Sequence, residues 1–170
     1  SSFSFNKKWL ASCDETEKMV IYQAGYKGFS VMQILVLAGI INALKIVKKE
    51  KENCKVVING AGSAGIAIAR LLMTYGFSSL ILCDKEGILS PQGENLNQVQ
   101  KKMALLTNPE KKTGTLSQAL AGADIFVGVS APGIVTQEMV ASMNQDSILF
   151  AMANPVPEIM PDLAKAAGAR

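Results

Sequence analysis

Histidine is the residue that this sequence lacks altogether, with none in 170 positions. Its absence excludes Ser-His-Asp and Cys-His catalysis, His-ligated zinc and an imidazole pH switch within this chain. Cysteine is scarce too: Cys13, Cys54 and Cys83 are odd in number and form no C-x-x-C pair. Such spacing argues against a disulfide framework or a four-cysteine metal site and suits thiols packed in or near a core. We therefore expect a cytoplasmic protein, kept in a reducing compartment.

An excess of charge of either sign is lacking as well. The chain has 17 basic and 14 acidic residues, a net charge of +3, and only 18% charged residues. Since no basic stripe stands out, we expect no nucleic-acid partner. With 49% hydrophobic residues the chain can bury a core, which excludes an intrinsically disordered class. Its length suits one domain.

One long uncharged run, residues 28–44, raises the question of a membrane span. It is at the short limit for crossing a bilayer, and Ser30, Gln33 and Asn42 interrupt it. It also lies too far from residue 1 to be a signal peptide. We predict a helix over residues 31–48 that is buried in a core or an oligomer contact, and so a homo-oligomer with no membrane partner.

Short apolar strands alternate with helical segments along the rest of the chain. Strands are predicted over residues 55–59, 79–83, 124–129 and 147–152. Helices are predicted over residues 31–48, 64–75, 97–106 and 136–143, from the capping box Thr115-Leu116-Ser117-Gln118, and from Pro161 onward. Residues 85–95 read as a loop. This alternation predicts an α/β fold, a doubly wound parallel sheet that binds ligands at the carboxyl ends of its strands.

The domain organisation follows from the same pattern. Residues 30–170 form the predicted domain. Residues 1–29, with a break at Gly25–Gly28, stay unassigned and are interpreted as a remnant or linker of a missing domain.

The sharpest motif is Gly60-Ala61-Gly62-Ser63-Ala64-Gly65, between a predicted strand and a predicted helix. In a Rossmann-type turn the first glycine permits the tight turn, the second lets a pyrophosphate approach, and the third lets helix and sheet pack closely. Free amides at the helix start, including those of Ser63 and Ala64, would then hold the phosphates. The alternative is a strand-turn-helix junction whose glycines are only structural.

Asp84 ends the second predicted strand, 19 residues beyond Gly65. A carboxylate there accepts hydrogen bonds from an adenosine ribose diol and repels a 2′-phosphate, which favours NAD. Lys85 could instead meet a 2′-phosphate, so NADP stays open. The plain alternative for Asp84 is a surface aspartate.

Two further loops follow strands at the same predicted edge. Ser130, Ala131 and Pro132 follow the third strand, where small residues would let a nicotinamide ribose pass. Asn154 follows the fourth, and its amide could bind a carboxamide, hydroxyl or carboxylate. Each loop alone could equally be an ordinary turn.

These residues also carry a family resemblance. Its motifs are Asn59–Ala69, Cys83–Gly87, Leu106–Pro109, Gly128–Gly133 and Phe150–Pro161, in that order. Together with residues 37–39 and 42–45 they resemble the NAD-binding domain of malic enzymes, especially the shorter bacterial type. The resemblance runs from about residue 34 to residue 170.

The resemblance implies oxidative decarboxylation of malate to pyruvate and CO2, with NAD and a Mg2+ or Mn2+ ion. Gly60, Gly62, Gly65 and Asp84 would hold NAD, and Asn154 matches a family asparagine that contacts substrate near the nicotinamide. The paired acids that supply a metal ligand in the family are replaced here by residues 27–32, which hold no carboxylate. The family's Tyr and Lys acid/base pair belongs to an N-terminal domain that residues 1–29 do not match.

Family members also continue past residue 170 into another strand and a second substrate asparagine. We therefore expect a cofactor domain that is incomplete as a catalyst and truncated at its C-terminal end. The alternatives are a shikimate-dehydrogenase-like or other NAD(P) oxidoreductase domain, and a non-catalytic nucleotide-binding module.

Overall fold

The long first helix differs from its prediction. The computed structural model describes residues 15–170, with side chains from residue 31 onward, so Cys13 lies outside the described residues. Helix α2 runs over Glu15–Val47, beginning well before residue 31, and it continues through Gly25 and Gly28. The predicted break at these glycines is therefore wrong. A glycine inside a helix costs only about 1 kcal/mol, which neighbouring helical residues can offset.

The chain divides into two compact units, Ser1–Leu35 and Val36–Arg170. The second contains a five-stranded sheet in the order β3-β2-β1-β4-β5. Its strands are β1 (Lys55–Asn59), β2 (Ser79–Asp84), β3 (Gly87–Ile88), β4 (Ile125–Gly128) and β5 (Ile148–Ala151).

Four of the strands are parallel, as β1 pairs with β2 and β4, and β4 pairs with β5. Strand β3 runs antiparallel to β2, where a loop was expected. The chain passes from β1 to β2 on one side and returns to β4 on the other, so the topological switch point lies beside β1. The predicted α/β fold is confirmed.

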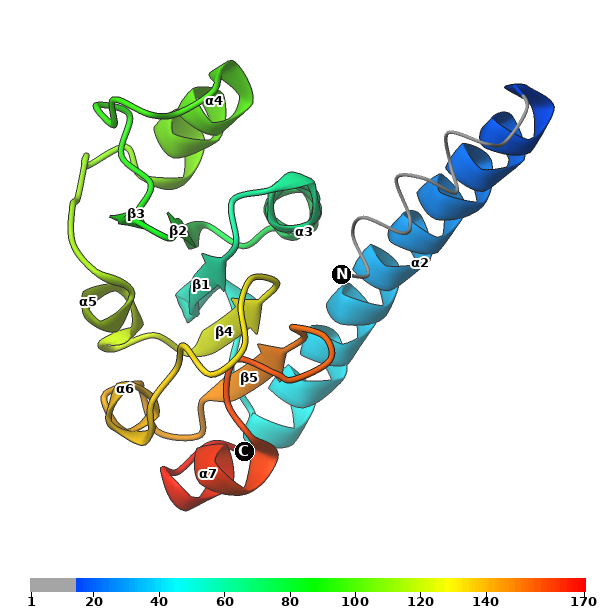
Figure 1. The fold of residues 1–170 in the computed structure, drawn as a ribbon. Helices are drawn as coiled ribbons and strands as arrows, with labels where there is room; N and C mark the ends of the chain where they lie inside the picture. The colour runs from blue at the N-terminus through cyan, green and yellow to red at the C-terminus, as the bar shows by residue number, and fades with distance from the viewer. Residues whose placement is uncertain (1–14) are drawn as a thin grey trace. The chain divides into compact units, whose positions relative to one another are not determined.

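Helices follow the strands in alternation (Figure 1). They are α3 (Ser63–Tyr75), α4 (Gln98–Thr107), α5 (Leu116–Leu120), α6 (Gln137–Ala141) and α7 (Pro161–Ala166), with a 3-10 turn over Lys51–Asn53. Both α4 and α5 begin with a capping box, formed by Asn97 with Gln100 and by Thr115 with Gln118. Helix α3 ends at Gly76, which takes the left-handed conformation common just past a helix.

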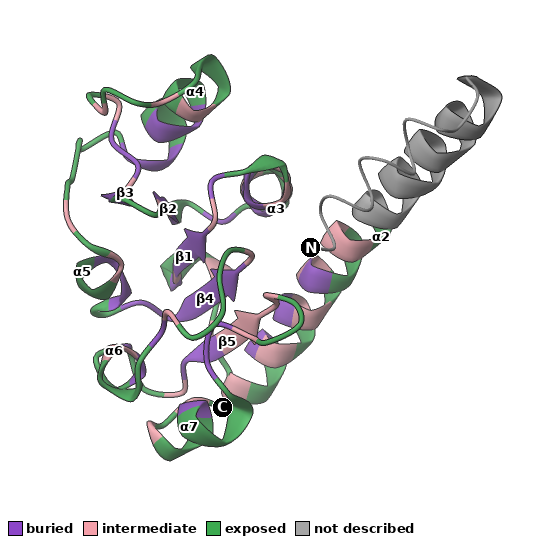
Figure 2. Ribbon diagram, in the orientation of Figure 1, coloured by how far each residue is buried: buried purple, intermediate pink, exposed green. Residues whose placement is uncertain are grey.

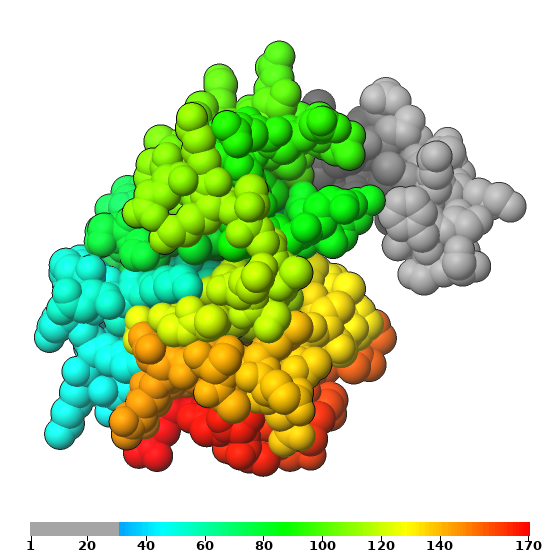
Figure 3. Space-filling view, turned by 90° about the vertical axis from the view of Figure 1, so that its left-hand side faces the viewer, coloured from blue at the N-terminus to red at the C-terminus, as the bar shows by residue number. Residues whose placement is uncertain are grey.

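Helices cover both faces of the sheet. Val57 and Phe126 point to the face that packs against α5, α6 and α7, and Figure 3 shows those helices from outside. The central strands β1 and β4 are buried along most of their length, whereas β5 is largely half-buried (Figure 2). Within α2, Val36, Ile40 and Leu44 are buried at the four-residue spacing of a helix face.

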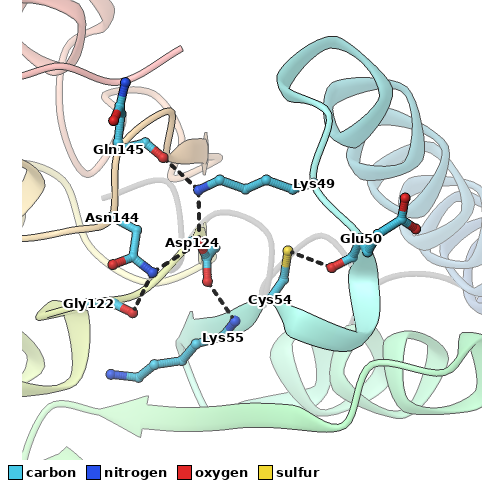
Figure 4. Close-up of polar contacts among 8 residues, drawn as sticks. All are labelled: Lys49, Glu50, Cys54, Lys55, Gly122, Asp124, Asn144 and Gln145. Atoms are coloured by element: carbon cyan, nitrogen blue, oxygen red, sulfur yellow. Dashed lines mark hydrogen bonds and ion pairs between the residues drawn. The ribbon is translucent and has the colours of Figure 1, made fainter.

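A buried carboxylate holds the amino-terminal edge of the sheet together (Figure 4). Asp124, just before β4, accepts hydrogen bonds from Lys49 Nζ (2.8 Å), the Lys55 amide (2.9 Å) and Asn144 Nδ2 (3.0 Å). Lys49 Nζ also donates to the Gln145 carbonyl at 2.6 Å. Burial alone would raise the pKa of Asp124, but these hydrogen bonds outweigh it and lower that pKa from its ordinary value. This cluster ties the end of α2 to the segments that lead into β1, β4 and β5.

Candidate functional site

The opposite edge of the sheet, where the parallel strands end, contains a cavity of about 450 Å³. Asn59 and Gly60 from the end of β1, Asp84 from the end of β2, and Ser130 and Ala131 after β4 all line it. The residues come from the two sides of the switch point, the place where open α/β sheets bind ligands. Sequence-predicted residues from three separate motifs therefore meet at one cavity.

The glycine turn has three glycines with three different surroundings. Gly60 has a φ of +119°, in the region that favours glycine, and a Cβ there would lie 2.7 Å from the Val129 carbonyl oxygen. A Cβ on Gly65 would collide with the Gly60 carbonyl oxygen. Gly62, in contrast, has no atom within 4 Å of the place that a Cβ would occupy. The fold itself requires the first and third glycines, whereas the second leaves space beside the backbone.

Helix α3 begins at this turn without a side-chain cap. Its N-cap residue is Gly62, and its first turn contains no acidic residue. By comparison, α4, α5 and α6 are each capped by a side chain, from Asn97, Thr115 and Thr136. The first amides of a helix need acceptors from outside its own backbone, and they carry the positive end of its dipole. The start of α3, at Ser63 and Ala64, therefore has backbone amides of the kind that bind anions at helix starts.

Asp84 stands at the end of β2, with Lys85 and Glu86 following it. One Asp84 carboxylate oxygen accepts from the Glu86 amide at 2.8 Å, which turns the chain around the cavity rim. Lys85 is exposed, and its ammonium lies 3.5 Å from the Glu86 carboxylate. These three residues also border a second cavity, of about 630 Å³, whose far wall includes Gln100. The residues shared by the two cavities therefore include two carboxylates and one exposed ammonium.

The sequence-based reasoning missed Glu158, a fully buried residue whose carboxylate joins two site loops. Its Oε1 accepts from the Ser130 amide and its Oε2 from the Ala153 amide, both at 3.0 Å. A Cβ on Gly128 would come within 2.6 Å of Oε1. A glycine inside a strand marks a close approach of other atoms, and this signal at Gly128 could have pointed to a buried partner.

A second contact fixes the loop after β4. The side-chain amide of Asn59, which is buried, donates to the Ser130 hydroxyl at 2.6 Å. Ser130 is thus held by β1 through its side chain and by Glu158 through its backbone.

Six of the predicted residues line neither of these cavities. Four of them belong to the glycine turn and the start of α3, namely Gly62, Ser63, Ala64 and Gly65. The other two, Pro132 and Asn154, are exposed in the loops after β4 and β5. The Glu158 carboxylate holds Ala153, the neighbour of Asn154, against the loop that contains Pro132. The structure brings these two loops together without showing what either side chain binds.

The buried thiol of Cys83 lies next to the site but is unreactive. Burial, together with the neighbouring Asp84 carboxylate, raises its pKa to about 12. At neutral pH the thiol is protonated and a poor nucleophile. The chemistry of this edge must therefore come from other groups or from a ligand.

Within the described residues, no three acidic or cysteine side chains come together in a way that could hold a metal ion. The side chains present there do not fit the Mg2+ or Mn2+ ion that the resemblance implies. In the same part of the chain, no helix has the length and hydrophobicity needed to cross a bilayer.

The sheet order, the glycine turn at the start of α3 and the cavity at the switch point define a Rossmann-type nucleotide-binding domain. A family model described as "Malic enzyme, NAD binding domain" matches residues 31–166. The chain belongs to the malic enzyme family, as its NAD-binding domain.

Individual relatives agree with this assignment. The chain is 48% identical over 137 residues to a bifunctional malic/malolactic enzyme of Bacillus subtilis, covering 80% of this chain and 33% of the relative. It is 38% identical to an NADP-dependent malic enzyme of Halomonas elongata, covering 90% and 37%. The crystal structure of an NAD-dependent malic enzyme from Thermotoga maritima matches with a TM-score of 0.75 and 43% identity, covering 81% of this chain and 37% of that one. The chain thus spans about a third of the length of these proteins.

Proposed function

We propose that this chain binds NAD at the carboxyl edge of its sheet and forms the cofactor side of a malate-oxidising active site. The observation that carries the proposal is the glycine turn, where an uncapped helix start adjoins the open space at Gly62. Gly62 is exposed, so the space beside its backbone is open to a ligand, and a pyrophosphate would use both the space and the amides.

The phosphates would lie against Gly62 and the amides of Ser63 and Ala64. The adenosine would extend into the cavity toward Asp84, whose carboxylate can accept from both ribose hydroxyls. The site favours NAD over NADP, because Asp84 and Glu86 would repel a 2′-phosphate while Lys85 supplies one exposed ammonium near Glu86. The relative from Halomonas elongata is NADP-dependent, so the preference for NAD needs its own test, separate from nucleotide binding.

At the other end of the cofactor, the nicotinamide ribose would pass Ser130, Ala131 and Pro132, and Asn154 would contact the substrate. NAD supplies a hydride acceptor: malate loses hydride from C2 and a proton from its hydroxyl. Loss of CO2 then leaves the enolate of pyruvate, which takes up a proton at C3 to give pyruvate. The role of this chain is to hold the two loops in place, through Glu158, and to aim the Asn154 amide. We assign no catalytic acid or base among the described residues, and we expect NAD binding without malate turnover by this chain alone.

The proposal also covers the oligomeric state of the protein and its location in the cell. We propose a homo-oligomer, supported by the exposed apolar side chains Ile34, Leu35 and Ile46 on α2, and light scattering after gel filtration tests it. We propose a cytoplasmic location, supported by the free thiols of Cys54 and Cys83.

The binding proposal is tested by calorimetric titration of the chain with NAD and with NADP, followed by a malate-dependent reduction assay with Mn2+. We expect binding with a preference for NAD, and Asp84→Asn should reduce that preference. If neither nucleotide binds, the cofactor site is wrong. An unchanged NAD/NADP ratio in Asp84→Asn would remove Asp84 from its role, and rapid malate turnover would refute the expected inactivity of the chain alone.

A further inference from the structure

Gln100, in the first turn of α4, is hydrogen-bonded at both ends of its side-chain amide. Its Oε1 accepts from the Asn97 amide at 3.0 Å, which completes the capping box of α4. Its Nε2 donates to the Ala61 carbonyl oxygen at 3.1 Å. One partner is a donor and the other an acceptor, so the two contacts fix which way the side-chain amide faces.

The contact at Ala61 controls one peptide of the glycine turn. A trans peptide is planar, so its N–H points opposite to its C=O. With the Ala61 carbonyl held toward Gln100, the Gly62 N–H faces away from α4. Ala61 is 4% exposed, and a carbonyl at such a buried position needs a partner. Gln100 meets this need from 39 residues away.

Without that partner the peptide could turn over. Gly62 has no Cβ to block the rotation, and glycine adopts positive and negative φ about equally readily. The flipped form would exchange the Gly62 N–H for the Ala61 carbonyl oxygen. An oxygen carrying partial negative charge would then face the space where a donor is needed, and it would repel a phosphate.

We propose that Gln100 is a positioning residue for the dinucleotide phosphates, locking the Ala61–Gly62 peptide in its phosphate-receiving orientation. The inference rests on the proposed NAD site, and it extends that site to a residue outside the glycine motif. Gln100 would then have two functions, since it caps α4 through Asn97 and orients the Ala61–Gly62 peptide. The equivalent glutamine of α5, Gln118, uses its Oε1 in the same way to accept from the Thr115 amide.

The test uses two variants that remove the donor in different ways. Gln100→Glu keeps an oxygen for the Asn97 amide, and Gln100→Met adds no charge near the phosphates. The matched control is Gln137→Met, which removes the same type of contact, from Gln137 Nε2 to the Leu163 carbonyl. Each purified chain is titrated with NAD, ADP-ribose and adenosine, and its urea unfolding midpoint is measured.

We expect both Gln100 variants to bind NAD and ADP-ribose about fivefold to tenfold more weakly, the range for loss of one hydrogen bond between neutral groups. Adenosine has no phosphate, so its affinity should stay unchanged, as should every affinity of Gln137→Met. Wild-type affinity for ADP-ribose in Gln100→Met would overturn the inference. So would an equal loss for adenosine and ADP-ribose, since that indicates general disturbance of the fold. Failure of the wild-type chain to bind NAD would instead overturn the proposed function, and the role of Gln100 with it.

Discussion

Alanine at two positions of the glycine turn should separate folding from binding. Gly62→Ala places a methyl group where no protein atom lies within 4 Å, at a backbone conformation (φ −83°, ψ −170°) that alanine also adopts. Gly65→Ala places the same methyl group against the Gly60 carbonyl oxygen, with Ile58 Cγ2 at 3.4 Å behind it. The two changes are chemically identical, so any difference between them comes from their surroundings.

The magnitudes follow from those surroundings. In Gly65→Ala the clash is with backbone, so α3 must move away from the turn, and overpacking of this kind costs about 1–3 kcal/mol or more. In Gly62→Ala the methyl group meets no protein atom, and the reduced entropy of the unfolded chain should raise the unfolding free energy by about 0.4–1 kcal/mol. Alanine is a poorer N-cap residue than glycine, which offsets this gain by a similar amount. Binding should nevertheless weaken, because the Gly62→Ala methyl group occupies the space assigned to the pyrophosphate. A tenfold loss of NAD affinity would correspond to about 1.4 kcal/mol.

Urea unfolding followed by circular dichroism gives the free energy of each variant, and calorimetry gives its NAD affinity. We expect Gly62→Ala to be about as stable as the wild type, clearly more stable than Gly65→Ala, and to bind NAD poorly. If it binds NAD with wild-type affinity, the pyrophosphate does not approach the turn at Gly62. If Gly65→Ala is as stable as the wild type, the close packing of α3 on the turn has been misjudged.

Two further predictions concern buried carboxylates. Glu158→Gln leaves the amide of either Ser130 or Ala153 facing an NH2 group instead of an acceptor. This change should lower the unfolding free energy by about 1–3 kcal/mol. A denaturant unfolding curve that matches the wild type would contradict this prediction. For Asp124, the folded-state pKa lies below the ordinary 3.8, so its ionised form stabilises the fold above about pH 4 and that stability is lost as the pH falls through the folded pKa. Asp124→Asn should therefore lose less stability than the wild type between about pH 5 and pH 2, and parallel stability curves for the two proteins would refute the linkage.

The sheet and most helices were predictable because their signals are local. The run Lys55–Asn59 is β-branched and bounded by glycine, and it forms β1 at the predicted residues. The capping box at Thr115 likewise predicted the start of α5. Strand β3 was not predictable, since two residues carry no periodicity and exist as a strand only by pairing with β2. The early start of α2 was not predictable, because glycines such as those at 25 and 28 are more typical of a helix end than of a helix interior.

The motifs of the candidate site were predictable from the sequence, but the hydrogen bonds that link one motif to another were not. Gly60, Asp84 and Ser130 belong to separate segments, and the expected parallel sheet was enough to bring them to one edge. Glu158 was missed because a charged residue in a proline-rich loop reads as solvent-exposed. Its burial depends on two backbone amides from different loops, and no pattern in the sequence reports such a long-range hydrogen bond. The contact from Gln100 to the glycine turn was missed for the same reason.

The uncapped start of α3 has a thermodynamic consequence. A helix that relies on a bound anion to complete its first turn is less stable whenever that anion is absent. By mass action, a ligand at about a hundred times its dissociation constant adds about 2.7 kcal/mol to the stability of the folded chain. The lifetime of this domain against proteases should then follow the concentration of free nucleotide around it, so that the cofactor also protects the protein that binds it.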